Sequence, residues 1–171
     1  MIARSFVVLL LCAAPAFAQQ PPAPKFGCED KPEVRQFDFW VGEWKVLVTG
    51  TENVAGQNSI QLINQSCALL ENWTSARGGA GKSINFYNAA TGKWHQTWID
   101  NQGGVTFFTG EYRDNAMRFE GERVGANGTT SPVRLTFTKL AADTVRQLGE
   151  GTPDGGQTWT VQYDLTYVRE P

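Results

Sequence analysis

Short segments in which apolar and polar residues alternate recur along most of the chain. Val133, Leu135 and Phe137 alternate with polar neighbours. From Trp159 to Tyr167, every second residue is aromatic or aliphatic. A period of two is typical of strands that bury one face. The pattern predicts ten strands and no long helix, with strands near residues 39–50, 58–64, 67–75, 82–88, 93–100, 104–112, 116–124, 132–139, 143–150 and 158–169.

The connections between these segments contain residues that form tight turns. Residues 88–92, 101–104, 114–115 and 154–156 supply Asn, Asp and Gly, which tolerate the positive φ of hairpin turns. Strands that are neighbours in sequence should therefore pair in antiparallel fashion. Closure of such strands removes the sheet edges and encloses an interior. We therefore predict an all-β, up-and-down antiparallel barrel of about ten strands, with a two-sheet sandwich as the alternative.

Residues 37–44, with the sequence FDFWVGEW, place four aromatic residues and a glycine where the folded domain should begin. A strand period puts Trp40, Gly42 and Trp44 on one face, which should point into the barrel. We therefore expect the first strand to start near residue 39.

Gly42-x-Trp44, together with Arg169 near the end of the last predicted strand, resembles the glycine-x-tryptophan and terminal arginine of the calycin barrels, the lipocalin-like superfamily. The first and last strands of a closed barrel meet, so the Arg169 guanidinium should lie over the Trp44 ring and donate hydrogen bonds to nearby carbonyls. These three residues are predicted to be structural. Trp44 should plug the closed end of the barrel, with any ligand lying towards Trp73 and Trp98.

A narrower resemblance covers nearly the whole chain after its N-terminal segment. Residues 37–44, with CALLENW at 67–73, GKWHQTWID at 92–100 and VRQ at 145–147, are similar to a family of uncharacterised bacterial secreted proteins. The resemblance implies a calycin-like barrel of the lipocalin or nitrobindin kind. It implies no particular reaction, ligand or active site.

The N-terminus has the composition of a secretory signal peptide. Arg4 precedes an apolar run over residues 6–14, and small residues lead to a cleavage site after Ala18. The run is too short to anchor the chain as a transmembrane helix. We therefore expect a signal peptide at 1–18, a flexible Pro-rich leader at 19–31 and a single barrel domain at 32–171, exported to the periplasm or beyond.

Cys28 and Cys67 remain after this cleavage, and an oxidising compartment favours a disulfide between them over reactive thiols. The bond would attach the segment before the first strand to the barrel wall. A catalytic cysteine would need a base, and nothing in the sequence connects the one histidine, His95, to either cysteine.

Charge and histidine content restrict the partners. The formal net charge is −2 without a basic run, which argues against nucleic acid and anionic membranes. Burial of Trp94 and Trp98 on one strand face would point His95 outward, which argues against haem ligation. A lone histidine makes no stable zinc site. We predict a small-molecule partner, no cofactor and no metal, and no pattern indicates the oligomeric state.

Residues 152–159, TPDGGQTW, fit the Asp-box pattern known from the hairpin turns of sialidase propellers. A propeller needs several four-stranded blades, and this chain has one such box. We interpret the segment as a local turn in which Asp154 accepts backbone amides and Trp159 packs below.

Polar residues on the predicted inner faces form the candidate binding surface. Glu71 shares a face with Trp73. A buried carboxylate needs ordered water, a ligand or a cation such as Arg123 or Arg146. The candidate ligand-binding residues are Glu71, Trp73, Asn85, Tyr87, Trp94, Gln96, Trp98, Arg146 and Tyr163.

The sequence thus predicts an exported barrel that holds a partly apolar small molecule in its interior. Two alternatives stay open. One is a barrel enzyme that uses Glu71 or Asp100 as an acid or base on a small lipophilic or aromatic substrate. The other is a solid-cored structural envelope protein with an exposed apolar patch. No nucleophile motif or phosphate loop is visible in the sequence, so we predict no catalytic residue.

Overall fold

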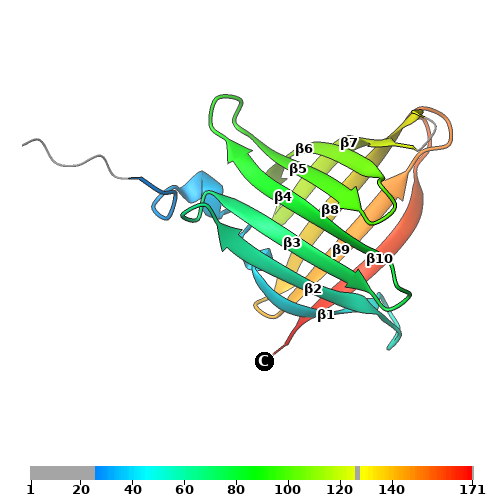
Figure 1. Ribbon diagram of the computed structural model, residues 1–171, viewed down its shortest axis with the longest axis horizontal. Helices are drawn as coiled ribbons and strands as arrows, with labels where there is room; N and C mark the ends of the chain where they lie inside the picture. The colour runs from blue at the N-terminus through cyan, green and yellow to red at the C-terminus, as the bar shows by residue number, and fades with distance from the viewer. Residues whose placement is uncertain (1–25, 126–127, 171) are drawn as a thin grey trace, which may run out of the picture.

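The computed structural model describes residues 26–125 and 128–170. Ten strands form one closed barrel, in which each strand pairs with its neighbours in sequence and the first pairs with the last (Figure 1). The strands are β1 (Gly42–Val48), β2 (Val54–Ile63), β3 (Ala68–Ser75), β4 (Ala80–Asn88), β5 (Lys93–Asp100), β6 (Val105–Arg113), β7 (Ala116–Val124), β8 (Thr130–Ala141), β9 (Thr144–Gly151) and β10 (Thr160–Arg169). The predicted barrel is confirmed. One closed sheet contains every described strand, which excludes the sandwich.

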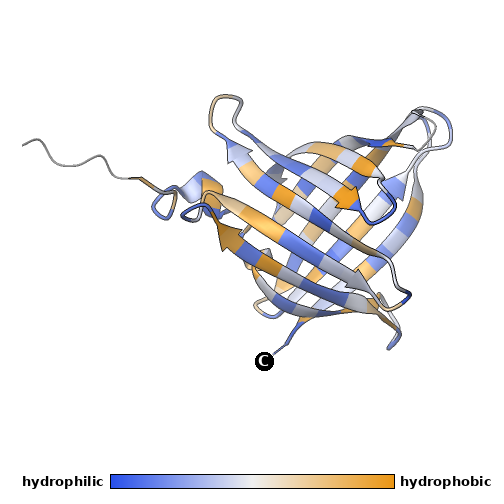
Figure 2. Cartoon of the chain, in the orientation of Figure 1, coloured by the Kyte–Doolittle hydropathy of each residue, from blue (hydrophilic) through white to orange (hydrophobic). Residues whose placement is uncertain are grey.

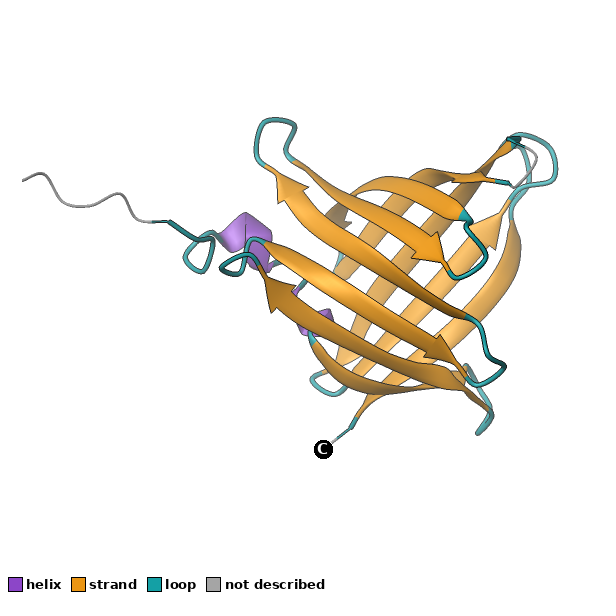
Figure 3. Ribbon diagram, in the orientation of Figure 1, coloured by secondary structure: helices purple, strands orange, loops and turns teal. Residues whose placement is uncertain are grey.

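The predicted signal peptide at 1–18 lies outside the described residues, as does most of the predicted leader at 19–31. Within the described ranges, no helix is long and apolar enough to cross a membrane. Two short 3-10 turns, η1 (Pro32–Arg35) and η2 (Asp38–Trp40), precede the barrel (purple in Figure 3).

Alternation along the strands separates the two faces of the sheet. Val133, Leu135 and Phe137 are at most 4% exposed, which confirms that they point inward. Figure 2 shows the same alternation as blue and orange bands along most strands. The pattern fails at the start of β10, where a bulge between Val161 and Tyr163 leaves Val161 60% exposed. A bulge shifts the side-chain period by one residue, so inward pointing begins only at Tyr163.

The first strand begins at Gly42 rather than near residue 39, because the preceding residues form η2. Gly42 has φ 137°, and a Cβ there would overlap the Arg169 guanidinium. Only glycine accepts both constraints readily. Trp40 therefore enters the barrel from a 3-10 turn instead of a strand, and it is fully buried.

Aromatic rings fill the end of the barrel at which β1 starts, which we call the closed end. The Phe37 and Trp40 rings stack with centroids 4.9 Å apart, and the Trp40 and Phe137 centroids are 4.5 Å apart. The indole Nε1 of Trp44 donates to the Trp40 carbonyl at 2.8 Å. Because these rings pack closely against one another, they form a solid plug.

The barrel closes where β1 meets β10. Trp44 lies opposite Arg169 in the pairing of these strands. The Arg169 guanidinium carbon is 4.3 Å from the Trp44 ring centroid, and Nη1 donates to the Val41 carbonyl at 2.9 Å. These contacts bring Gly42, Trp44 and Arg169 together at the barrel closure, where the sequence analysis predicts a structural role for them.

A disulfide joins Cys28 to Cys67, with Cα atoms 4.8 Å apart, as the sequence predicts. The Cys28 amide also donates to the Gln65 carbonyl at 3.1 Å. Cys67 lies in the turn that joins β2 to β3, so the bond attaches the N-terminal segment to the closed end.

The Asp-box segment forms the β9–β10 turn. One Asp154 oxygen accepts the amides of Gln157 and Thr158 at 3.0 and 2.8 Å. These hydrogen bonds, those from Thr158 foremost, lower the pKa of Asp154 to about 2. The Arg134 guanidinium lies 3.9 Å from the Trp159 ring centroid. The contacts are those of the local turn that we predicted.

Candidate functional site

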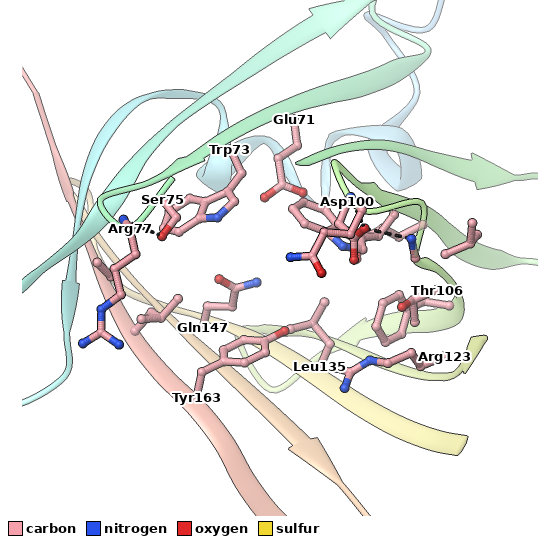
Figure 4. A pocket seen from close by; sticks show the side chains of 18 of the residues that line it. Glu71, Trp73, Ser75, Arg77, Asp100, Thr106, Arg123, Leu135, Gln147 and Tyr163 are labelled. Carbon is pink, nitrogen blue, oxygen red and sulfur yellow. Dashed lines mark hydrogen bonds between the residues drawn. The ribbon is translucent and has the colours of Figure 1, made fainter. Parts of the chain in front are cut away.

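A cavity of about 1070 Å³ occupies the barrel interior at the end opposite the plug, which we call the open end (Figure 4). The turns that follow β1, β3, β5 and β7 contribute to its rim. Trp73, Trp98, Phe108, Tyr163 and Leu165 supply most of its large apolar side chains. The interior here is hollow, unlike the filled core that a purely structural barrel would have.

All four of these aromatic rings lie against the barrel wall. Each rests on a glycine of a neighbouring strand, so closely that a Cβ at the glycine would overlap the ring. The pairs are Trp73 on Gly56, Trp98 on Gly81, Phe108 on Gly121 and Tyr163 on Gly149. Glycine within a strand often marks such a close approach. Because the same residues line the cavity, their rings lie between the strand backbone and the hollow.

The floor of the cavity is polar, and Glu71 of β3 is its centre. Glu71 is 4% exposed. Its Oε1 accepts from Asn58 Nδ2 at 2.7 Å, and its Oε2 accepts from the Ser83 hydroxyl at 2.6 Å. Both partners are neutral, and none of the described Lys or Arg residues forms an ion pair with Glu71.

The network continues on both sides of Glu71. Asn85 donates to the Ser83 hydroxyl at 2.9 Å and accepts from Gln96 Nε2 at 2.6 Å. On the other side, the Tyr167 hydroxyl accepts from Asn58 at 3.1 Å and donates to Gln147 Oε1 at 2.7 Å. Hydrogen bonding of this kind is what makes buried polar groups tolerable.

Burial raises the pKa of Glu71 to about 7, although the hydrogen bonds from Ser83 and Asn58 act in the opposite direction. Burial and then the negative charge of Glu71 raise the pKa of Tyr163 to about 12. The pKa of Tyr167 is raised for the same two reasons, in the same order. Glu71 thus changes its charge near neutral pH, whereas both tyrosines stay neutral.

Of the nine predicted ligand-binding residues, five line the cavity, namely Glu71, Trp73, Gln96, Trp98 and Tyr163. Asn85 does not line it but supports Gln96 from below. Their binding role stays a prediction, and the structure brings them to one compartment.

The other three predicted residues lie elsewhere. Trp94 is fully buried beside the plug, where its Nε1 donates to Gln36 Oε1 at 3.2 Å. Tyr87 packs against Trp94, with ring centroids 6.1 Å apart. Arg146 points outward between two inward residues of β9 and pairs with Asp164, donating from Nε at 2.8 Å and from Nη2 at 2.5 Å. Arg146 therefore cannot be the cation for Glu71.

The predicted set did not include several polar residues of the site. Asn58, Ser83, Thr106 and Gln147 are all buried on inner faces. They obey the same period of two as the predicted residues, so extending the alternation to weakly apolar strands would have found them. Arg123 does line the cavity, and its Nη1 donates to Gln162 at 3.1 Å.

Asp100 was considered as an acid or base and His95 as a haem ligand, and both side chains make other contacts. Asp100 lies at the rim, where its Oδ1 accepts the amides of Gln102 and Gly104, each at 2.8 Å. It therefore caps the β5–β6 turn. His95 lies on the outer face of β5, stacked on Phe86 with centroids 5.4 Å apart. Across the described residues, no three His, Cys, Asp or Glu side chains gather as a metal site would require.

Comparison with known proteins gives the chain no family assignment. No protein-family model matches it. A search of curated proteins also found no match. The closed ten-stranded barrel is compatible with a calycin-like fold.

Proposed function

We propose that this protein is an exported carrier that binds a small, partly apolar molecule in the cavity at the open end. The observation that carries the proposal is a hollow of about 1070 Å³ walled by aromatic rings. Small-molecule sites are concave and mostly apolar, with a few polar groups that orient the ligand. This cavity has a mostly apolar, aromatic wall and a polar floor, as such sites do.

The cavity also has a polarity along its axis. Glu71, Gln96 and Gln147 bring polar groups to the floor, whereas Arg77, in the turn after β3, and Arg123, near the end of β7, lie nearer the rim. An elongated ligand would therefore be oriented, with one polar group at the floor and its apolar body between the rings. Export is supported by the disulfide, because oxidising compartments favour such bonds.

Intrinsic fluorescence tests the proposal directly. Two of the six tryptophans, Trp73 and Trp98, line the cavity. A panel of fatty acids, aromatic compounds, retinoid-like compounds and hemin should include a ligand that changes the emission saturably. Trp73→Phe and Trp98→Phe should each reduce the change, whereas Trp159→Phe, in the β9–β10 turn, should preserve it. A panel without any saturable response would refute the proposal.

A second candidate function, an enzyme, is favoured by one observation. A carboxyl group with a pKa near 7 suits acid or base catalysis at neutral pH. Because turn amides engage Asp100, this candidate depends on Glu71 alone. Conversion of a bound compound that is lost in Glu71→Gln would support an enzyme, and binding without conversion would support a carrier.

The structural alternative accounts for only one feature of the molecule. Ile84, Ile99 and Phe107 lie on the outer face of adjacent strands and are 48%, 51% and 55% exposed. An exposed apolar patch agrees with that alternative. The hollow interior does not agree with a solid-cored structural protein. A carrier function explains it.

A further inference from the structure

No Lys or Arg within residues 26–125 and 128–170 supplies a counter-charge to Glu71, although Glu71 is almost fully buried. Its two hydrogen-bond partners, Asn58 and Ser83, are neutral. In Figure 4 its carboxylate points from β3 towards the side of the cavity where Gln147 and Tyr163 lie. Each oxygen accepts one hydrogen bond from these partners, which leaves further lone pairs for a donor in the cavity. When Glu71 is ionised, none of the described residues places a cation beside it, and a bound ligand can supply one.

The other charged and titratable groups that the structure describes around the cavity do not provide a cation for Glu71. Arg123 of β7 is directed to Gln162, and Arg77 lies in the turn after β3. Tyr163 and Tyr167 of β10 are neutral at physiological pH. On β5, the Asp100 carboxylate is occupied by turn amides at the rim. On β2, β4 and β9, the groups that face Glu71 are uncharged amides and a hydroxyl.

The wall beside Glu71 suits a cation that carries an apolar body. Trp73 lies two residues along the same strand, and Trp98 and Tyr163 also line the cavity. The three rings lie against glycines of neighbouring strands and border the cavity, so a cation in the cavity can approach them. Ring faces attract cations, most strongly where water is excluded.

We propose that the ligand is an organic amine, with its ammonium group paired to Glu71 and an apolar or aromatic body against Trp73, Trp98 and Tyr163. This inference rests on the proposed carrier function and names its ligand class. A carboxylate head group at the same depth would meet Glu71 with the same charge and would lose its own hydration. The floor therefore selects amines over acids.

Binding of the amine is coupled to the ionisation of Glu71. Below pH 7 much of the Glu71 population is protonated, and it must release its proton to pair with an ammonium group. The ionised fraction rises about tenfold between pH 6 and pH 8, and amine affinity should rise by about the same factor. The affinity of a neutral analogue should stay nearly constant over this range.

Three probes with one body and different head groups test the inference on the full mature chain. Pyrenebutylamine, pyrenebutanol and pyrenebutyrate are titrated at pH 8 and followed by pyrene fluorescence and calorimetry. The amine should bind at least about tenfold tighter than the alcohol, equivalent to about 1.4 kcal/mol, and the acid should bind most weakly. Glu71→Gln should remove the preference for the amine but retain binding of the alcohol. Glu120→Gln, a matched change on the exposed outer surface, should retain the preference.

The outcomes separate this inference from the function on which it rests. Equal affinities, tightest binding of the acid, no binding of the amine, or a preference that survives Glu71→Gln would each overturn the amine assignment. The carrier function would stand if the alcohol, the acid or any compound of the fluorescence panel still bound. It would fail only if nothing in either set bound. The comparison of head groups on the unmodified protein decides the case even if Glu71→Gln does not fold.

Discussion

The two ends of this barrel use the same aromatic residue types with opposite results. At the closed end, Phe37 and Trp40 come from the N-terminal segment and stack on each other, and Phe137 meets Phe37 edge-on and Trp40 at a tilt, so the interior is filled. At the open end, Trp98 and Tyr163 lie on glycines and leave a cavity. Phe119 of the filled core also lies against a glycine, Gly110, so the difference comes from the rings that the N-terminal segment adds to the closed end.

The polar residues follow the same division. In the plug, Trp44 Nε1 donates to the Trp40 carbonyl, and the buried Trp40 Nε1 has no hydrogen-bond partner among the described residues. The open end instead retains a carboxyl group, Glu71, to which none of the described cationic side chains is paired. We infer that the closed end supplies stability and the open end supplies function.

Removal of a plug ring should have the largest effect. Trp44 is 1% exposed and packs against Tyr167 and Arg169. Trp44→Ala should lower the free energy of unfolding by about 3 to 5 kcal/mol, the usual cost of a large buried cavity. Denaturant titration measures the loss, and Trp98→Ala should cost less because Trp98 already borders a cavity. A stable Trp44→Ala variant that no longer binds ligand would contradict the division between the ends.

Glu71→Gln should stabilise the protein in a pH-dependent manner. The folded-state pKa of Glu71, about 7, lies above its ordinary value of 4.5, so the unfolded state releases the proton first. The wild type therefore loses stability as pH rises from about 4.5 through 7, by as much as about 3 kcal/mol. Gln cannot ionise, so the variant should gain relative stability over this range. Denaturant titrations of both proteins at pH 4.5 and pH 8 check this, and a constant difference would argue against a buried ionisable Glu71.

Gly149→Ala should partly close the cavity. The added Cβ would overlap the Tyr163 ring and move it from the wall. We expect ligand affinity to fall about tenfold, with about 1 to 3 kcal/mol lost from folding. Gly79→Ala is the control, because its Cβ meets only the Ser75 Cβ at an ordinary 3.6 Å. Equal affinities in both variants would show that the ring does not border the bound ligand.

Arg146→Gln should have the smallest effect. The Arg146 side chain is 43% exposed and pairs with Asp164 on the outer surface. Exposed ion pairs contribute at most about 1 kcal/mol, and ligand affinity should not change. Calorimetry with any ligand found in the fluorescence panel measures this, and an altered affinity would place Arg146 in the site after all.

Alternation in the sequence predicted the ten strands and the five candidate residues that line the cavity, because face orientation follows from a period of two. It could not predict depth along the barrel axis, which strand tilt and stagger determine. Trp94 and Tyr87 are inward as expected but lie by the plug. Arg146 was misplaced because β9 reverses the usual pattern, with Gln147 inside and Leu148 only partly buried outside.

The other differences between the predicted and the observed structure arose where local backbone geometry overrides the strand period of two. The φ of Gly42 and the preceding 3-10 turn depend on the approach of Arg169, which is distant in sequence. The bulge before Tyr163 left no signal in the alternation of residues 158–169. Glycines within strands, such as Gly81 and Gly149, were the available signal for rings that lie against the barrel wall, since a strand glycine often marks a close approach.

The most direct test of the division between the two ends is an NMR spectrum of the tryptophan indole N–H groups, recorded during titration with pyrenebutylamine. Trp→Phe variants assign the signals. We expect the Trp73 and Trp98 signals to shift saturably, while those of Trp44 and Trp159 remain in place. Shifts at Trp44 without shifts at Trp73 and Trp98 would contradict the account, because the ligand would then lie at the closed end.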